Sequence, residues 1–140
     1  MPLDPPAPGS PEDWLRHARS DLALAQQRQV PEVLLAALCF HAQQAVEKAL
    51  KGFLDARLGT HPKSHSLEQM LLYDARIHTE LWKWRTPCRN LDRFYIPTRY
   101  ADALPGLLPA GEPTETDAQD ALNDAKAIVT EIREKIGGKK

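Results

Sequence analysis

Apolar residues recur at steps of three and four along most of the chain, and strict alternation of apolar and polar residues does not persist anywhere. Steps of three and four place apolar side chains on one face of an α-helix, whereas alternation is typical of a β-strand. The pattern therefore predicts an all-α protein. The predicted helices span residues 11–28, 31–58, 67–75, 80–95 and 115–136.

Residues that favour helix ends support these boundaries. The predicted caps are Ser10, Ser66 and either Thr114 or Thr116 at N-termini, and Gly59 at a C-terminus. Pro31 is expected to open the second helix, because proline is well suited to the first turn. Pro87 lies inside the fourth predicted helix, which must either bend there or restart with Thr86 as its cap.

The order of these helices predicts a four- to five-helix up-and-down antiparallel bundle. Residues 1–10 are rich in proline and are expected to form a flexible lead-in. Residues 11–137 have the length of one domain and are expected to form a single helical domain. Residues 96–113 hold four prolines and two glycines, which predicts an irregular loop.

The composition is typical of a soluble globular protein, with 42% hydrophobic residues, 26% charged residues and a formal net charge of −1. A charge so close to zero gives no overall attraction to nucleic acid or to an anionic membrane. The charge is nevertheless uneven, because residues 83–99 hold five basic residues and one acid, while residues 112–124 hold five acids and no lysine or arginine. This local basic patch is the first indication of function.

Several classes of protein are not expected. The chain has two cysteines and no Cys/His ligand pattern, so we predict no disulfide framework, no metal site and no cofactor. Cys39 lies among apolar residues and is expected to be buried. The N-terminal residues lack the features of a secretion signal, and no apolar run approaches the roughly 20 residues that span a bilayer. We therefore expect a cytoplasmic protein that does not contact the membrane.

Residues 40–54 read FHAQQAVEKALKGFL and place polar residues regularly beside an apolar face. Gln44, Lys48 and Lys51 follow one another at i, i+4 and i+7, so they share one strip of the helix. This strip is either a solvated flank, in which Glu47 pairs with Lys51, or a functional edge. The two adjacent glutamines are also suited to hydrogen bonds with a neighbouring helix or subunit.

This stretch, together with THPKSHSLEQML and FYIPTRY further along, resembles the HEPN family, a domain shared by prokaryotes and higher eukaryotes and associated with nucleotides. The family pattern is a helix containing Phe-x-Ala-Gln-Gln-Ala-x-Glu-Lys-x-Leu-Lys, then a His-Ser/Asp-Leu turn and an aromatic-x-Pro-x-Arg-Tyr segment. The matching residues are Phe40, Gln43, Gln44, Ala45, Glu47, Lys48, Leu50, Lys51, His65, Leu67, Tyr95, Arg99 and Tyr100. The resemblance covers roughly residues 12–135.

The resemblance implies a helical bundle similar to the substrate-binding domain that accompanies small nucleotidyltransferases. Such proteins often form homodimers, and many prokaryotic members form a two-gene module, like a toxin–antitoxin pair, with a minimal nucleotidyltransferase as the partner. Many members are also metal-independent endoribonucleases, which act through an arginine followed after four to six residues by a histidine. The implied ligand is a nucleotide or RNA.

The Arg/His pair of those ribonucleases is absent from this chain. The five histidines are His17, His41, His61, His65 and His78, and none follows an arginine at that spacing. Cleavage by the ribose hydroxyl needs a group that moves a proton near neutral pH, whereas arginine holds a phosphate but stays protonated. Ribonuclease activity is therefore not expected, and an enzymatic alternative would have to use His65 or Tyr95.

Phosphate binding needs no such pair. Arg89 and Arg93 share one helix face and Arg99 follows, so their guanidinium groups are candidates to bind phosphate while a tyrosine stacks on a base. In the alternative, the arginines pair with Asp92 and with acids of the last helix, and the protein is an interaction or dimerisation module. The predicted phosphate-binding residues are Arg89, Arg93, Arg99, Tyr100, Lys48, Lys51 and Gln44. The leading hypothesis is a non-catalytic, nucleotide- or RNA-phosphate-binding subunit beside a nucleotidyltransferase.

Overall fold

The computed structural model describes residues 4–95 and 112–137, so the predicted site residues Arg99 and Tyr100 lie outside the described residues. Every regular element in the described ranges is helical, which confirms the predicted fold class. The elements are α1 (Pro11–Ala25), α2 (Leu35–Leu58), α3 (Leu67–Leu71), α4 (Ala75–Leu81), the 3₁₀ turn η1 (Trp82–Trp84), α5 (Arg85–Asp92) and α6 (Glu115–Gly137).

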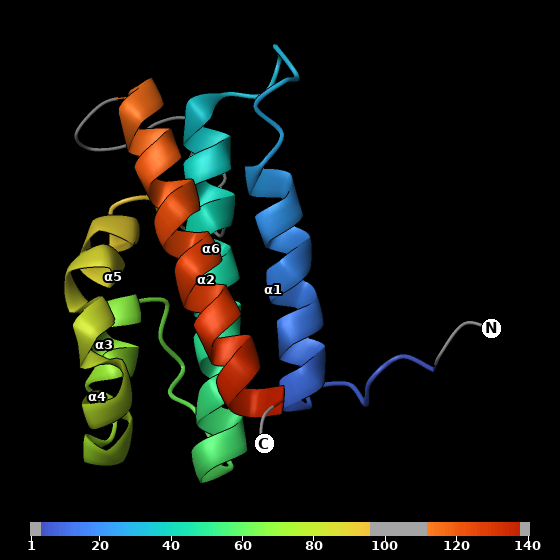
Figure 1. Ribbon diagram of the computed structural model, residues 1–140, viewed down its shortest axis with the longest axis vertical. Coiled ribbons are helices and arrows are strands. Elements are labelled where there is room, and N and C mark those ends of the chain that lie inside the picture. Colours follow the sequence, from blue (N-terminus) through green and yellow to red (C-terminus); the bar gives the residue numbers. More distant parts are fainter. Residues whose placement is uncertain (1–3, 96–111, 138–140) are drawn as a thin grey trace.

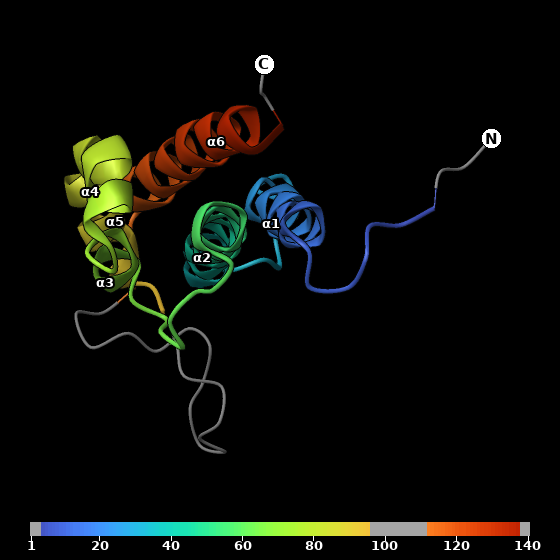
Figure 2. The same ribbon diagram turned by 90° about the horizontal axis from the view of Figure 1, so that it is seen from below.

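The three long helices α1, α2 and α6 run side by side, and the short helices form a fourth column next to them (Figure 1). The direction of the chain alternates through α1, α2, the column from α4 to α5, and α6, which is the predicted up-and-down order (Figure 1). Seen end-on, α2 lies between α1 and the short helices, while α6 covers one side of the bundle (Figure 2). Among the described residues, no helix covers the opposite side of α2.

The core forms where the predicted apolar faces meet. The apolar face of α6 is buried and consists of Ala118, Ala121, Leu122, Ala125, Ile128, Val129 and Ile132. Cys39 is fully buried, as expected, and burial raises the pKa of its thiol to about 11. Between α1 and α2 the backbones approach closely at Gly52, where an added Cβ would lie 2.9 Å from the Cβ of Trp14.

The predicted caps are confirmed. The hydroxyl groups of Ser10, Ser66 and Thr114 each accept a backbone N–H three residues later, and Gly59 ends α2 with a φ of 77°. Several boundaries were predicted wrongly. α3 ends at Leu71 rather than at residue 75, the next helix begins at Ala75 rather than at residue 80, and α5 ends at Asp92 rather than at residue 95. α1 ends at Ala25 rather than at residue 28, and α2 begins at Leu35 rather than at residue 31. A turn closed by a hydrogen bond from the N–H of Val33 to the carbonyl of Val30 (3.0 Å) occupies the residues before α2.

The fourth predicted helix is interrupted rather than bent. The chain leaves α4 at Leu81, passes through η1 and starts a new helix at Arg85, so Pro87 is the third residue of α5. The first four N–H groups of a helix have no intrahelical acceptor, and proline therefore removes no bond there. The predicted restart is confirmed, but it begins two residues earlier than proposed, with Trp84 rather than Thr86 at the cap position.

Candidate functional site

One face of α2 carries a polar stripe, which consists of His41, Gln44, Lys48, Lys51 and Asp55. Steps of three and four residues keep these side chains on one side of the helix. Each of the five is partly exposed, whereas the neighbouring apolar positions of α2 are buried against α1, α6 and the short helices. The stripe therefore lies on the side of α2 that is not covered by any helix of residues 4–95 and 112–137 (Figure 2).

Beside this stripe, Glu47 is a buried carboxylate with only 3% of its surface exposed. It accepts hydrogen bonds from Lys51 Nζ (2.9 Å), from His65 Nδ1 (3.1 Å) and from Gln44 Nε2 (3.2 Å). A buried charge is tolerated when it is paired in this way. The predicted pairing of Glu47 with Lys51 is confirmed, but a solvated flank is wrong for Glu47, because its carboxylate lies in the interior.

His65 connects this carboxylate to the end of α5. Its ring stacks on the ring of Tyr95, with centroids 4.5 Å apart and planes 13° from parallel. The backbone carbonyl of His65 accepts a hydrogen bond from Gln43 (3.1 Å), so the loop before α3 is tied to α2. Because an ionised carboxylate only accepts hydrogen bonds, Nδ1 carries the proton toward Glu47, and Nε2 is the acceptor nitrogen of the neutral ring. We call Glu47, Lys51, His65 and Tyr95 the Glu47 cluster.

A second buried carboxylate lies where α1 meets the stripe. Asp21 of α1 is 6% exposed and accepts hydrogen bonds from His41 Nδ1 (2.9 Å) and Lys48 Nζ (2.5 Å). Burial by itself would raise the pKa of Asp21, but the hydrogen bonds from His41 and Lys48 outweigh it and hold the pKa below its usual value. We call Asp21, His41 and Lys48 the Asp21 cluster.

The two described arginines of the predicted site lie on α5 and at its end, and each faces an acid. Arg89 donates to Glu68 (2.6 Å), and this bond lowers the pKa of the Glu68 carboxyl. Arg93 lies 3.8 Å from Asp117 of α6, one of the acids considered as its partner. Asp92 does not pair with an arginine among the described contacts; it accepts the backbone N–H groups at the start of α3 instead.

A cavity of about 320 Å³ lies beside Arg93, between α5 and α6. Its lining includes Asp117, Asp120 and Asp124, and burial together with the nearby charge of Asp120 raises the pKa of Asp124. Three carboxylates around one guanidinium group oppose the entry of an anion. A phosphate is therefore favoured on the outer surface of the arginines, or at the polar stripe, rather than inside this cavity.

The described residues contain no group of three or more His, Cys, Asp or Glu side chains placed to hold a metal ion. None of the helices in residues 4–95 and 112–137 is both long enough and apolar enough to cross a membrane.

Comparison with known proteins agrees with this geometry. A family model described as the HEPN domain matches residues 11–135. The chain belongs to the HEPN family. TT1696 from Thermus thermophilus is 35% identical, with a TM-score of 0.72, and ST0689, an archaeal HEPN homologue, is 29% identical, with a TM-score of 0.67. Each comparison covers 91% of this chain and 98% of the other. No curated protein matches the chain.

In this HEPN domain the predicted site residues fall into two groups. Gln44, Lys48 and Lys51 lie together on the polar stripe, and the two catalytic candidates His65 and Tyr95 stack beside them. None of the contacts among the described residues joins Arg89 or Arg93 to this stripe. Arg89 faces Glu68 and Arg93 faces Asp117 of α6, and more than half of each of these two arginine side chains is exposed.

Sequence reasoning missed the Asp21 cluster of this HEPN domain. Part of the cluster could have been predicted from the spacing of His41 and Lys48, which are seven residues apart and therefore lie on the same strip of α2. Asp21 could not be assigned to that strip, since it lies on another helix and joins Lys48 across 27 positions of the chain.

Proposed function

We propose that this HEPN domain protein binds a nucleotide or an RNA phosphate. In this proposal it is a homodimer and the non-catalytic subunit of a toxin–antitoxin-like module with a minimal nucleotidyltransferase. The observation that carries the ligand is the Glu47 cluster, in which an ammonium group and a half-exposed imidazole share one buried carboxylate beside a tyrosine ring. Membership of the HEPN family supports the partner and the homodimer.

The chemistry of the Glu47 cluster suits a nucleotide. Lys51 has three N–H donors and uses one of them on Glu47, so donors remain for a phosphate oxygen. The stacked rings of His65 and Tyr95 offer a flat surface for a base, an interaction worth about 1–3 kcal/mol per base. Lys48 and Gln44 extend the polar surface along α2, and the exposed guanidinium groups of α5 are available to a longer ligand. Arg99 and Tyr100 remain predicted contributors, and the proposal does not depend on them.

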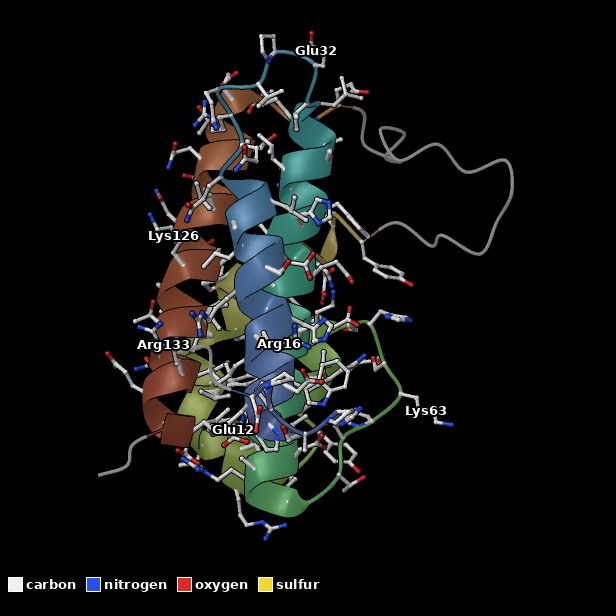
Figure 3. All side chains as sticks on the ribbon, turned by 90° about the vertical axis from the view of Figure 1, so that its right-hand side faces the viewer. Glu12, Arg16, Glu32, Lys63, Lys126 and Arg133 are labelled. Atoms are coloured by element: carbon white, nitrogen blue, oxygen red, sulfur yellow. The ribbon has the colours of Figure 1, made fainter. Side chains whose placement is uncertain are left out.

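A binding titration tests this function. We would titrate the protein with adenosine and guanosine monophosphates and with a short RNA, and compare the wild type with His65→Ala. Loss of the stacking surface is expected to weaken binding by about tenfold. The matched control is Lys126→Gln, which removes a cation that projects from α6 (Figure 3). A wild type that binds no probe, or an equal effect of both variants, would reject the proposal.

The partner and the homodimer need separate measurements. Light scattering on the purified protein should give twice the chain mass, and co-expression with a minimal nucleotidyltransferase from the same genome should yield a stable complex. A monomer that does not co-purify with such a protein would remove this part of the proposal and leave ligand binding to be judged by the titration.

A second candidate function is a metal-independent endoribonuclease, and the contact between His65 and Glu47 favours it. A carboxylate on Nδ1 orients an imidazole so that Nε2 is able to act as a general base. His65 would take the proton of a ribose 2′-hydroxyl, whose oxygen attacks the adjacent phosphorus. The bond to the 5′-oxygen of the next nucleotide breaks, and that oxygen takes a proton from water.

RNA cleavage separates this candidate from binding alone. The wild type is incubated with RNA in the presence of a chelator, beside His65→Ala and the exposed-histidine control His17→Ala. Under the enzymatic function, the wild type and the control cleave and His65→Ala does not, and a 2′-deoxy substitution at the cleaved position stops the reaction. Intact RNA with the wild type would exclude the enzyme.

A further inference from the structure

The Asp21 cluster repeats the arrangement of the Glu47 cluster on the same face of α2. In each, a carboxylate is shared by one lysine Nζ and one histidine Nδ1. The carboxylate side chains are 9% and 4% exposed, respectively, so both are held in the interior. Two copies of one arrangement on one surface indicate a function beyond the stability of a single ion pair.

The histidine of the Asp21 cluster is not needed to balance the buried charge. Lys48 already neutralises Asp21 at 2.5 Å, and a buried carboxylate needs only one full counter-charge. His41 is nevertheless held by its Nδ1 and keeps 31% of its side chain exposed. Among the described residues, Nε2 of His41 has no hydrogen-bond partner, and Lys48 retains unused N–H donors. An ammonium group and an imidazole edge are thus presented together at the surface. A phosphate oxygen accepts from the ammonium group, and it accepts from Nε2 of His41 when the ring is protonated so that both ring nitrogens donate.

We propose that the Asp21 cluster is a second phosphate subsite, and that the ligand of this face is a single-stranded oligonucleotide rather than a mononucleotide. The inference rests on the proposed function of the Glu47 cluster and extends it along α2. The rise of an α-helix puts His41 about 15 Å from Lys51 along the axis, and Lys48 about 4.5 Å from Lys51. Lysine and imidazole groups spread over this length match successive phosphates of an oligonucleotide better than the single phosphate of a mononucleotide.

The same geometry sets the direction in which the oligonucleotide lies along α2. The stacked rings of His65 and Tyr95 lie at the Glu47 cluster, whereas at the Asp21 cluster the ring of Phe40 meets that of His41 edge-on, with centroids 5.5 Å apart and planes 70° from parallel. One base therefore stacks at the Glu47 cluster, while the next phosphate reaches Lys48 and His41. Recognition at the second subsite is through the backbone and is independent of base sequence.

The test compares ligand length in wild type and variants. Affinities for adenosine monophosphate and for a four-nucleotide RNA are measured over a range of salt concentrations with wild type, His41→Gln, Lys48→Gln and the control Lys126→Gln. Thermal unfolding first establishes that each variant is folded. His41→Gln keeps an amide that donates to Asp21, so it preserves the local structure if Lys48→Gln does not.

The wild type is expected to bind the RNA at least about tenfold more tightly than the mononucleotide, with a salt dependence steeper by about 0.7 in log–log slope for the additional phosphate. His41→Gln and Lys48→Gln should each remove this advantage, and His41→Gln should leave the mononucleotide affinity within about twofold, whereas the control retains the advantage. Equal affinity of the wild type for both probes, or an advantage that survives both variants, would overturn the second subsite and leave the proposed function intact. Binding of neither probe would overturn the proposed function, and the second subsite with it.

Discussion

Replacing Glu47 with glutamine asks whether charge, rather than shape, holds α2 to the loop before α3. Glutamine keeps the size of the side chain, and its carbonyl oxygen still accepts from Gln44. The substitution removes the negative charge opposite Lys51, whose side chain is only 13% exposed. It also weakens the hydrogen bond that orients His65. The variant therefore leaves one cation with little solvent and no counter-charge.

The expected loss of stability follows from this burial. Removing one partner of a buried ion pair destabilises a protein by about 3–5 kcal/mol. Lys51 keeps some access to water and is able to turn toward it, and the contact with the half-exposed His65 adds little, so we expect about 2–3 kcal/mol. For 140 residues, an unfolding entropy of about 2.1 cal/mol/K per residue converts this to a fall in Tm of about 7–10 °C.

Urea unfolding followed by circular dichroism at neutral pH measures this loss. The control variant is Glu68→Gln. The pair that Glu68 forms with Arg89 is solvent-exposed, so this variant should unfold close to the wild type. The double variant Glu47→Gln/Lys51→Met should recover part of the stability, because no buried charge is then stranded. The reasoning is refuted if the single variant loses less than about 1 kcal/mol, or if the two substitutions destabilise additively.

Three further substitutions probe other parts of the structure. Gly52→Ala, which presses a methyl group against α1, should lower the unfolding free energy by about 1–2 kcal/mol, although alanine has the better helix propensity. A variant that is more stable than the wild type in urea would contradict the close approach of α1 and α2. Asp92→Ala, which leaves backbone N–H groups of α3 without their acceptor, should destabilise by about 1–2 kcal/mol, and an unchanged urea midpoint would show that this cap is dispensable. Burial opposes the ionisation of Asp21, but hydrogen bonds from His41 and Lys48 lower its pKa overall. Ionised Asp21 therefore stabilises the folded state fully above the unfolded pKa of about 3.9, and this stabilisation is lost as pH falls through the lower folded pKa. The stability difference between wild type and Asp21→Asn should therefore shrink from pH 5 to pH 2, and a difference independent of pH would disprove this linkage.

The sequence by itself determined the helices, most of their ends and the faces that they bury. These features depend on residues within a few positions of one another: the spacing of apolar side chains, a hydroxyl three residues before an N–H, or a glycine after the last turn. The buried side of α6 and the caps at Ser10, Ser66 and Thr114 were predictable for this reason. The start of α2 was not, because the turn that closes at Val33 competes with proline as an opening signal.

Only the tertiary structure decided which polar groups meet. The strip on α2 was visible in the sequence, but Asp21 reaches it from α1, and His65 joins Glu47 across 18 positions of the chain. Helical periodicity states which side chains share a face, but it does not state which helix, loop or solvent lies opposite that face. That depends on how the whole bundle packs. Because of this packing, Glu47 is buried rather than exposed at the surface, and Asp92 accepts a backbone N–H at the start of α3 rather than pairing with an arginine.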